Sequence, residues 1–166
     1  MKLNLRADKL LLDVHGEAET EQLGKAISEV ARPGTVIALV GTLGAGKTRL
    51  SRAIAESLGV DPLAIASPTF VLIHEYQGRI PVFHFDTYRL GTSEEFEALG
   101  AIDYFEAGGV CLVEWADRVP DIVPPDAWWV RISLDEFDPA CRQIEVEAGP
   151  AILSALAHQL DVQPLR

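Results

Sequence analysis

The chain has 166 residues, 48% of them apolar and 23% charged, a composition typical of one soluble globular domain with a full core. Its net charge is −11, and only one lysine follows Lys25, which argues against direct binding of DNA or tRNA because nucleic-acid backbones repel an acidic surface. No apolar run is long enough to span a membrane, and the first residues do not resemble a signal peptide. We therefore expect a cytoplasmic protein with no membrane partner.

The expected organisation is a single domain over residues 1–166, with residues 1–8 as a candidate flexible N-terminal segment. Cys111 and Cys141 lie in apolar-patterned stretches without metal-binding spacing. This pattern indicates two buried thiols in a reducing compartment rather than a disulfide.

The first elements alternate between strand and helix patterns. The apolar pattern predicts a strand at Leu10–Val14, a helix at Glu17–Ala31 and a buried strand at Val36–Val40. The sequence Arg32-Pro33-Gly34 separates the helix from the second strand.

A glycine-rich loop follows that second strand. Residues 41–48, GTLGAGKT, fit G-x-x-x-x-G-K-[ST] at every fixed position. Glycines let backbone N–H groups face a phosphate, and the helix beginning near Gly46 adds its positive N-terminal end. Lys47 would reach the β- and γ-phosphates, and the Thr48 hydroxyl would bind Mg²⁺. The segment therefore predicts a nucleotide-binding loop.

Beyond the loop helix, which ends at Gly59, the pattern changes. Strands at Phe70–Tyr76 and Ile80–Phe85 are separated by a short turn and should pair as an antiparallel hairpin. This predicts a mixed rather than a purely parallel sheet. Ser67 and Thr69 precede the hairpin, where a hydroxyl would either sense the γ-phosphate or cap a turn.

The remaining elements complete an α/β pattern. They are a short helix at 92–99 ended by Gly100, a strand at 110–114, a second hairpin formed by Trp129–Leu134 and Cys141–Ala148, and a closing helix at Ala151–Leu160.

Two acids stand at strand ends, where a phosphate loop needs a partner for magnesium. Glu114 ends the apolar run before it and is the stronger candidate for the metal shell, while Asp86 is a candidate for a metal or water-positioning role. His84 shares a strand face with Asp86, but without a third ligand we interpret it as a hydrogen-bonded strand histidine. Trp115 would flank the nucleotide, whereas Trp128 and Trp129 are expected in the core and second hairpin.

Together these segments resemble the TsaE (formerly YjeE) family of P-loop ATPases in bacterial tRNA threonylcarbamoyladenosine biosynthesis. The matching pieces span most of residues 15–149 and are GTLGAGKT (41–48), SPTFVLIHEY (67–76), HFDTYRL (84–90), EEFEALGAIDYF (94–105) and CLVEWADR (111–118).

The resemblance implies a small mixed α/β P-loop fold, Mg²⁺-dependent binding of ATP or ADP with slow hydrolysis, and work as a subunit beside a TsaB–TsaD pair. tRNA would be reached only through those partners. The resemblance also implies nucleotide contacts from Thr20 and Arg142, although Thr20 taken alone looks like an ordinary surface residue. The full expected site comprises catalytic Lys47, Asp86 and Glu114; nucleotide-binding Thr20, Gly44, Ala45, Gly46, Lys47, Thr48, Trp115 and Arg142; and the metal ligands Thr48, Glu114 and Asp86.

Two positions depart from the family pattern, and other functions have to be weighed. Thr42 replaces the usual family aspartate, and Arg49 stands where a second threonine is common. A regulatory GTPase is nearly excluded, because its guanine-reading N-K-x-D motif needs an asparagine and the only one is Asn4. A small metabolite or nucleotide kinase is the main alternative, although no arginine-rich lid segment is evident. A non-hydrolysing binding module would keep Lys47 without needing Asp86.

Overall fold

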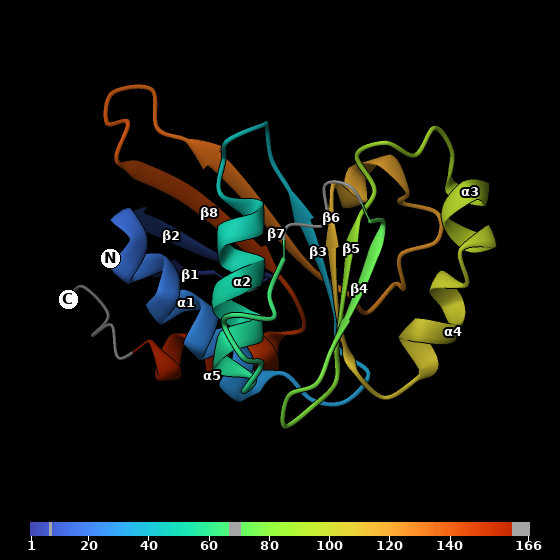
Figure 1. Ribbon diagram of the computed structural model, residues 1–166. Coiled ribbons are helices and arrows are strands. Elements are labelled where there is room, and N and C mark those ends of the chain that lie inside the picture. The colour runs from blue at the N-terminus through green and yellow to red at the C-terminus, as the bar shows by residue number, and fades with distance from the viewer. Residues whose placement is uncertain (7, 67–70, 161–166) are drawn as a thin grey trace.

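A mixed eight-stranded sheet runs through the molecule in the order β1-β2-β8-β7-β3-β6-β5-β4 (Figure 1). The computed structural model describes residues 1–6, 8–66 and 71–160. The strands are β1 (Lys2–Leu5), β2 (Lys9–His15), β3 (Val36–Val40), β4 (Ile73–Tyr76), β5 (Val82–Asp86), β6 (Val110–Glu114), β7 (Trp128–Leu134) and β8 (Cys141–Glu147). The helices are α1 (Gly16–Val30), α2 (Lys47–Ser57), α3 (Ser93–Ala98), α4 (Ala101–Glu106) and α5 (Pro150–Gln159), with a 3₁₀ turn, η1, at Ala116–Arg118.

The centre of the sheet is parallel and both of its sides are antiparallel. Strand β3 runs parallel to β6 on one side and to β7 on the other, and β6 runs parallel to β5. The pairs β4–β5, β7–β8, β2–β8 and β1–β2 are antiparallel. The predicted α/β fold with a mixed sheet is therefore confirmed, as are both predicted hairpins.

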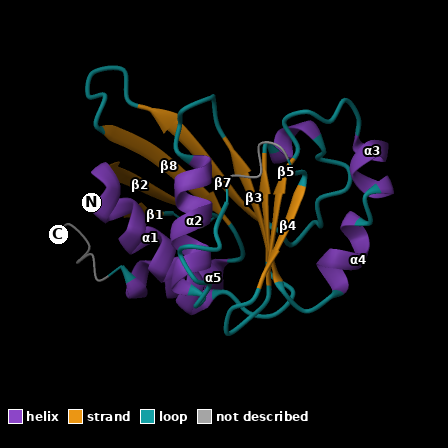
Figure 2. Ribbon diagram, in the orientation of Figure 1, coloured by secondary structure: helices purple, strands orange, loops and turns teal. Residues whose placement is uncertain are grey.

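Alternate residues of the central strands face two separate cores. Ile37 and Leu39 of β3 pack in the larger core beneath α1, α2 and α5, whereas Val36 and Ala38 pack on the opposite face with the aromatic cluster of α3 and α4. Figure 2 shows these two groups of helices beside different parts of the sheet. Burial on both faces explains why β3 reads as a continuous apolar run.

Helices α1 and α2 lie very close together at Gly24. A Cβ atom at this position would lie 2.6 Å from the Ala53 Cβ, far inside normal contact distance. The glycine therefore allows the helix that precedes β3 to pack directly on the helix that follows the loop. Leu50 and Ile54 of α2, and Leu58 directly after it, are buried as their spacing predicts.

Three expectations about the elements need correction. The N-terminal segment expected to be flexible contains β1, which pairs with β2 and is held by the backbone hydrogen bonds of that register. Helix α4 was not expected as a separate element; it begins directly after Gly100, whose left-handed backbone (φ 82) ends one helix and starts the next. Strand β4 begins at Ile73, and Phe70, the predicted start, lies outside the described residues.

The two cysteines agree with the sequence. Cys111 and Cys141 are both buried free thiols. Within the described ranges, no helix is long and apolar enough to cross a bilayer.

Candidate functional site

The GTLGAGKT loop connects the central strand to the start of α2. Gly44 and Gly46 adopt left-handed backbone conformations, with φ of 78° and 114°, which other residues rarely tolerate. Gly46 immediately precedes α2, and the part of the chain that the structure describes places no side-chain cap on this helix start. The first backbone N–H groups of α2 therefore have no side-chain acceptor among the described residues. A helix start of this kind, at the end of a glycine-rich loop, is suited to bind an anion.

Lys47 is folded back against its own loop. Its Nζ donates hydrogen bonds to the carbonyls of Gly41 (2.6 Å) and Thr42 (3.0 Å) and lies 3.6 Å from the centre of a Trp115 ring. The residue is only 5% exposed. Burial lowers the pKa of Lys47, and Glu114, Asp117 and Asp86 oppose that shift by favouring the charged form.

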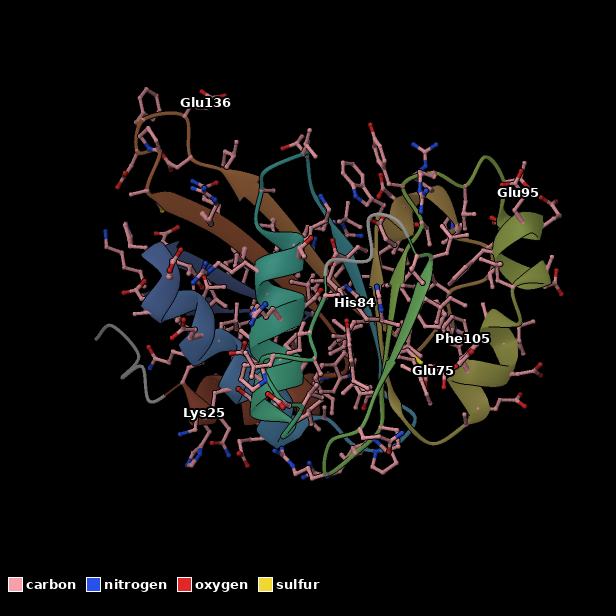
Figure 3. All side chains as sticks on the ribbon, in the orientation of Figure 1. Lys25, Glu75, His84, Glu95, Phe105 and Glu136 are labelled. Atoms are coloured by element: carbon pink, nitrogen blue, oxygen red, sulfur yellow. The ribbon has the colours of Figure 1, made fainter. Side chains whose placement is uncertain are left out.

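Glu114 is buried at the end of β6, with a partner for each carboxylate oxygen. Thr48 Oγ1 donates to Oε2 at 2.7 Å, and His84 Nε2 lies 2.7 Å from Oε1. His84 is labelled in Figure 3, where it lies within the fold on β5. The prediction that His84 is a hydrogen-bonded strand histidine is confirmed.

Asp86 lies beside Glu114, because the two residues are register partners at the ends of the parallel strands β5 and β6. One oxygen of Asp86, Oδ1, accepts a hydrogen bond from the backbone N–H of Tyr88 at 2.9 Å. The side chain is half-buried and lines the same cavity as the loop. Of the two acids, Asp86 is therefore the more accessible.

Trp115 has an unusual backbone conformation. It is the only non-glycine residue with positive φ (60°) among those described, and η1 begins directly after it. The Thr87 hydroxyl lies 2.9 Å from the Glu114 carbonyl and 2.8 Å from the Trp115 carbonyl, and this contact secures the turn. Strained backbone of this kind is concentrated at functional sites.

Two cavities flank the loop. The loop–β6 cavity has a volume of about 310 Å³ and is lined by Lys47, Thr48, Asp86, Tyr88, Glu114 and Trp115 together with loop residues. Its lining combines two cations, two carboxylates and two hydroxyls, because Arg49 also borders it. These groups suit a phosphate chain and its counter-ion.

The α1–β8 cavity lies on the other side of the loop and measures about 290 Å³. Thr20 of α1 and Arg142 of β8 line it, with an apolar surface from Leu50, Ile132, Ala140 and Ile144. Arg142 Nε also donates to the Ala45 carbonyl at 3.1 Å and so ties β8 to the loop. This cavity has the apolar lining and few polar groups that suit a flat organic ring.

Arg49 borders both cavities and pairs with α1. Its guanidinium lies 2.5 Å from a Glu17 carboxylate oxygen, and both side chains are exposed. This contact could not be predicted from local pattern, because it joins helices that are separated by β3.

The donor set fits magnesium better than a transition metal. The described residues contain no group of three or more His, Cys, Asp or Glu side chains arranged around a metal position. Thr48, Glu114 and Asp86 instead offer hard oxygen atoms around an open cavity, and Mg²⁺ is commonly held by one or two such ligands together with phosphate and water.

The structure thus brings the predicted site residues together in two groups. Lys47, Thr48, Asp86, Glu114 and Trp115 surround the loop–β6 cavity, while Thr20, Ala45 and Arg142 meet at the α1–β8 cavity. From its helix pattern alone, Thr20 was expected to be an ordinary surface residue, and this pattern did not predict that it lines the α1–β8 cavity. Ser67 and Thr69 lie outside the described residues.

The fold and the loop define a single-domain α/β protein of the P-loop type. A family model described as "Threonylcarbamoyl adenosine biosynthesis protein TsaE" matches residues 14–144. The chain belongs to the TsaE family.

Individual relatives support this assignment. The chain is 43% identical over 109 residues to the tRNA threonylcarbamoyladenosine biosynthesis protein TsaE of Bacillus subtilis, a match covering 65% of this chain and 67% of the relative. It is 34% identical to the Haemophilus influenzae protein of the same name, covering 82% and 90% of the two chains. The crystal structure of Bacillus subtilis YdiB superposes with a TM-score of 0.74 at 32% identity, covering 95% of this chain and 97% of the other. The predicted family membership is confirmed.

Proposed function

We propose that this chain binds ATP or ADP with magnesium, hydrolyses ATP slowly, and acts in the cytoplasm as the ATPase subunit of tRNA threonylcarbamoyladenosine biosynthesis. The observation that carries the proposal is the GTLGAGKT loop placed between two cavities of different chemistry. One cavity is lined by Lys47, Thr48 and two carboxylates, and the other has an apolar lining with Arg142. A nucleotide laid across the loop would place its phosphates in the first cavity and its base in the second.

The loop–β6 cavity would hold the phosphates mainly by electrostatics. Nucleotide phosphates would draw the Lys47 ammonium from the Gly41 and Thr42 carbonyls, and the amide groups at the start of α2 would bind their oxygens. Thr48 and Glu114 would hold magnesium, with Asp86 as a further ligand or the group that orients water. The ion would neutralise charge on the phosphate oxygens.

Asp86 is the best-placed residue to position the attacking water. Glu114 already has a close partner on each oxygen, whereas Asp86 is more exposed to the cavity and keeps one oxygen beyond its contact with the Tyr88 backbone. A carboxylate here would accept a hydrogen bond from water and so orient it toward the γ-phosphate.

The chain would act through partners rather than transfer a group itself. Its charge of −11 disfavours tRNA binding, so we propose that a TsaB–TsaD-type complex holds the tRNA and carries out the modification. Binding and hydrolysis of ATP would then drive a conformational cycle. The candidate responsive segment is 67–76, of which residues 67–70 lie outside the described part of the structure.

The test is a reconstituted tRNA-modification assay with the partner complex, comparing the wild type with Lys47→Ala. The wild type should support repeated turnover and the variant should not, because the variant loses the cation in the loop. Equal multiple-turnover yields would contradict the coupling. Phosphorylation of a small acceptor by the isolated chain would favour a kinase instead.

Nucleotide preference gives a simpler test. Because the chain lacks the guanine-reading motif, Mg–ADP should stabilise it against heat far more than Mg–GDP does. A hundredfold excess over the dissociation constant contributes about 2.7 kcal/mol, which is easily detected. Equal stabilisation by the two nucleotides would contradict an adenine site.

A further inference from the structure

A chain of hydrogen bonds, buried at His84 and Glu114 and exposed at Thr48, connects β5 and β6 to the start of α2. His84 Nε2 lies 2.7 Å from Glu114 Oε1, and Glu114 Oε2 accepts the Thr48 hydroxyl at 2.7 Å. His84 and Glu114 are each only 2% exposed. The loop threonine is thus connected through one carboxylate to a histidine on the neighbouring strand.

The chemistry of the carboxylate fixes the direction of these bonds. An ionised carboxylate can only accept, so His84 has to present an N–H at Nε2. Burying a carboxylate without such partners is costly, and each contact therefore also restricts how the Glu114 side chain is oriented. With Oε1 held by His84, Oε2 is the oxygen turned toward Thr48.

The orientation of Glu114 determines what Thr48 offers to the cavity. A threonine hydroxyl has one hydrogen and two acceptor lone pairs. When the hydrogen is donated to Glu114, the lone pairs remain for another partner. A cation bound by Thr48 requires this arrangement, because it can approach only a lone pair.

We propose that His84 is a positioning residue for magnesium-dependent nucleotide binding, acting through Glu114 on the Thr48 hydroxyl. This inference rests on the proposed function, and His84 itself touches neither the nucleotide nor the metal. Its contribution is the single N–H at Nε2. A side chain that fills the same space without a donor at that point does not replace it.

Two amide substitutions distinguish the effect of the hydrogen-bond donor at Nε2 of His84 from the effect of the volume of its side chain. The amide nitrogen of glutamine reaches the position of a histidine Nε2, whereas that of asparagine reaches only the position of Nδ1. Both side chains are neutral and polar, so His84→Gln and His84→Asn form a matched pair. The readout is the Mg²⁺ concentration that gives half of the thermal stabilisation by ADP.

The expected result is a wild-type Mg²⁺ requirement for His84→Gln and a requirement raised about tenfold for His84→Asn, as for the loss of one hydrogen bond to a charged group. Urea denaturation without nucleotide checks that both variants fold. A wild-type requirement in His84→Asn would overturn the proposal. An equal rise in both variants would also overturn it, because the shape of the ring rather than the donor would then matter.

A measurement on the unmodified protein keeps the proposal testable if the asparagine variant does not fold. Nitrogen-15 spectra of the histidines should show His84 protonated at Nε2, with slow exchange of that hydrogen, and the Nδ1-protonated tautomer would overturn the proposal. Wild-type protein that shows no Mg²⁺-dependent stabilisation by ADP would instead contradict the proposed function, and the inference with it.

Discussion

The indole of Trp115 lies over the ammonium group of Lys47, with 3.6 Å between Nζ and the ring centre. The same cation donates to the Gly41 and Thr42 carbonyls, so the tryptophan covers a lysine that is already held by the loop. The left-handed backbone at Trp115 and the Thr87 hydroxyl hold the ring in this place. A phosphate that draws Lys47 forward would therefore change the surroundings of the indole.

Nucleotide binding should change the tryptophan fluorescence through this contact. Addition of Mg–ADP to the wild type is expected to change the emission, and Trp115→Phe should remove most of that change, because the other two tryptophans lie on β7. Trp129→Phe serves as the matched control and should keep the change. If Trp115→Phe kept the full change in fluorescence, the nucleotide would have to bind away from Trp115.

Replacing Lys47 by methionine should stabilise the protein when no nucleotide is present. Burial lowers the pKa of Lys47 in the folded protein from its ordinary 10.5. Between the lowered pKa and 10.5, the unfolded chain binds more protons than the folded chain, so the free energy of unfolding rises with pH. At neutral pH the charged lysine therefore costs stability, and methionine removes this cost. Urea denaturation should show the stabilisation shrinking as pH approaches 10.5, while ADP no longer stabilises the variant. A less stable variant at neutral pH would contradict the prediction.

Asp86→Asn should separate hydrolysis from binding. We expect a loss of hydrolysis of about 10²- to 10⁴-fold, the range for a positioned acid–base group, with a much smaller change in ADP affinity. Phosphate release and ADP titration measure the two effects. Asp103→Asn on α4 is a control for the loss of one surface carboxylate. An unchanged hydrolysis rate in Asp86→Asn would reduce Asp86 to a structural strand-end acid.

Gly24→Ala should destabilise the fold although alanine is the better helix former. The added Cβ would lie 2.6 Å from the Ala53 Cβ, and overpacking of this kind costs about 1–3 kcal/mol against a helix gain of about 1 kcal/mol. Urea denaturation of Gly24→Ala, Ala53→Gly and the double variant forms a thermodynamic cycle. The double variant should be more stable than the sum of the single effects predicts, because glycine at 53 removes the closest contact of the new methyl group and leaves only the backbone carbon of residue 53 at 2.9 Å and the Ile54 nitrogen at 3.0 Å. If the effects of the two single substitutions on the free energy of unfolding were additive, the prediction would be wrong, because the helices would then move apart without loss of stability.

Cys111 should be inert in the folded protein. Burial raises the pKa of its thiol to about 12, so almost no thiolate is present at neutral pH. Cys141 is also buried, and burial raises its pKa as well. A thiol reagent should therefore label neither residue until the protein unfolds. Rapid labelling of the native chain would contradict this prediction.

Local pattern predicted the central strands and the loop well, because each forms one continuous run of characteristic residues. Strand β1 escaped prediction because it lies at the sheet edge with mostly exposed side chains, so its register with β2 rather than its own composition makes it a strand. Helix α4 has only six residues, which is too short for its periodicity to distinguish it from the end of the preceding helix.

The site residues were predictable wherever chemistry and spacing lie close together in the chain. Lys47, Thr48 and Glu114 follow from the loop motif and a strand-end acid, whereas the bond from His84 to Glu114 joins residues 30 positions apart. Thr87 and Arg49 were not expected to contribute, because their contacts depend on how separate elements pack. Hydrophobic periodicity says which face of an element is buried but not which polar groups meet there.

The strand order has a consequence for how the chain folds. The loop begins near residue 41, yet β3 pairs only with strands that come much later in the chain, and Arg142 donates to the Ala45 carbonyl across 97 positions. During synthesis the loop leaves the ribosome long before these neighbours do. Such non-local pairing slows folding, and it delays the finished loop until β8 has docked. A nucleotide that binds as proposed would therefore not guide the early folding of this chain; it would bind only after nearly all of the sheet is in place.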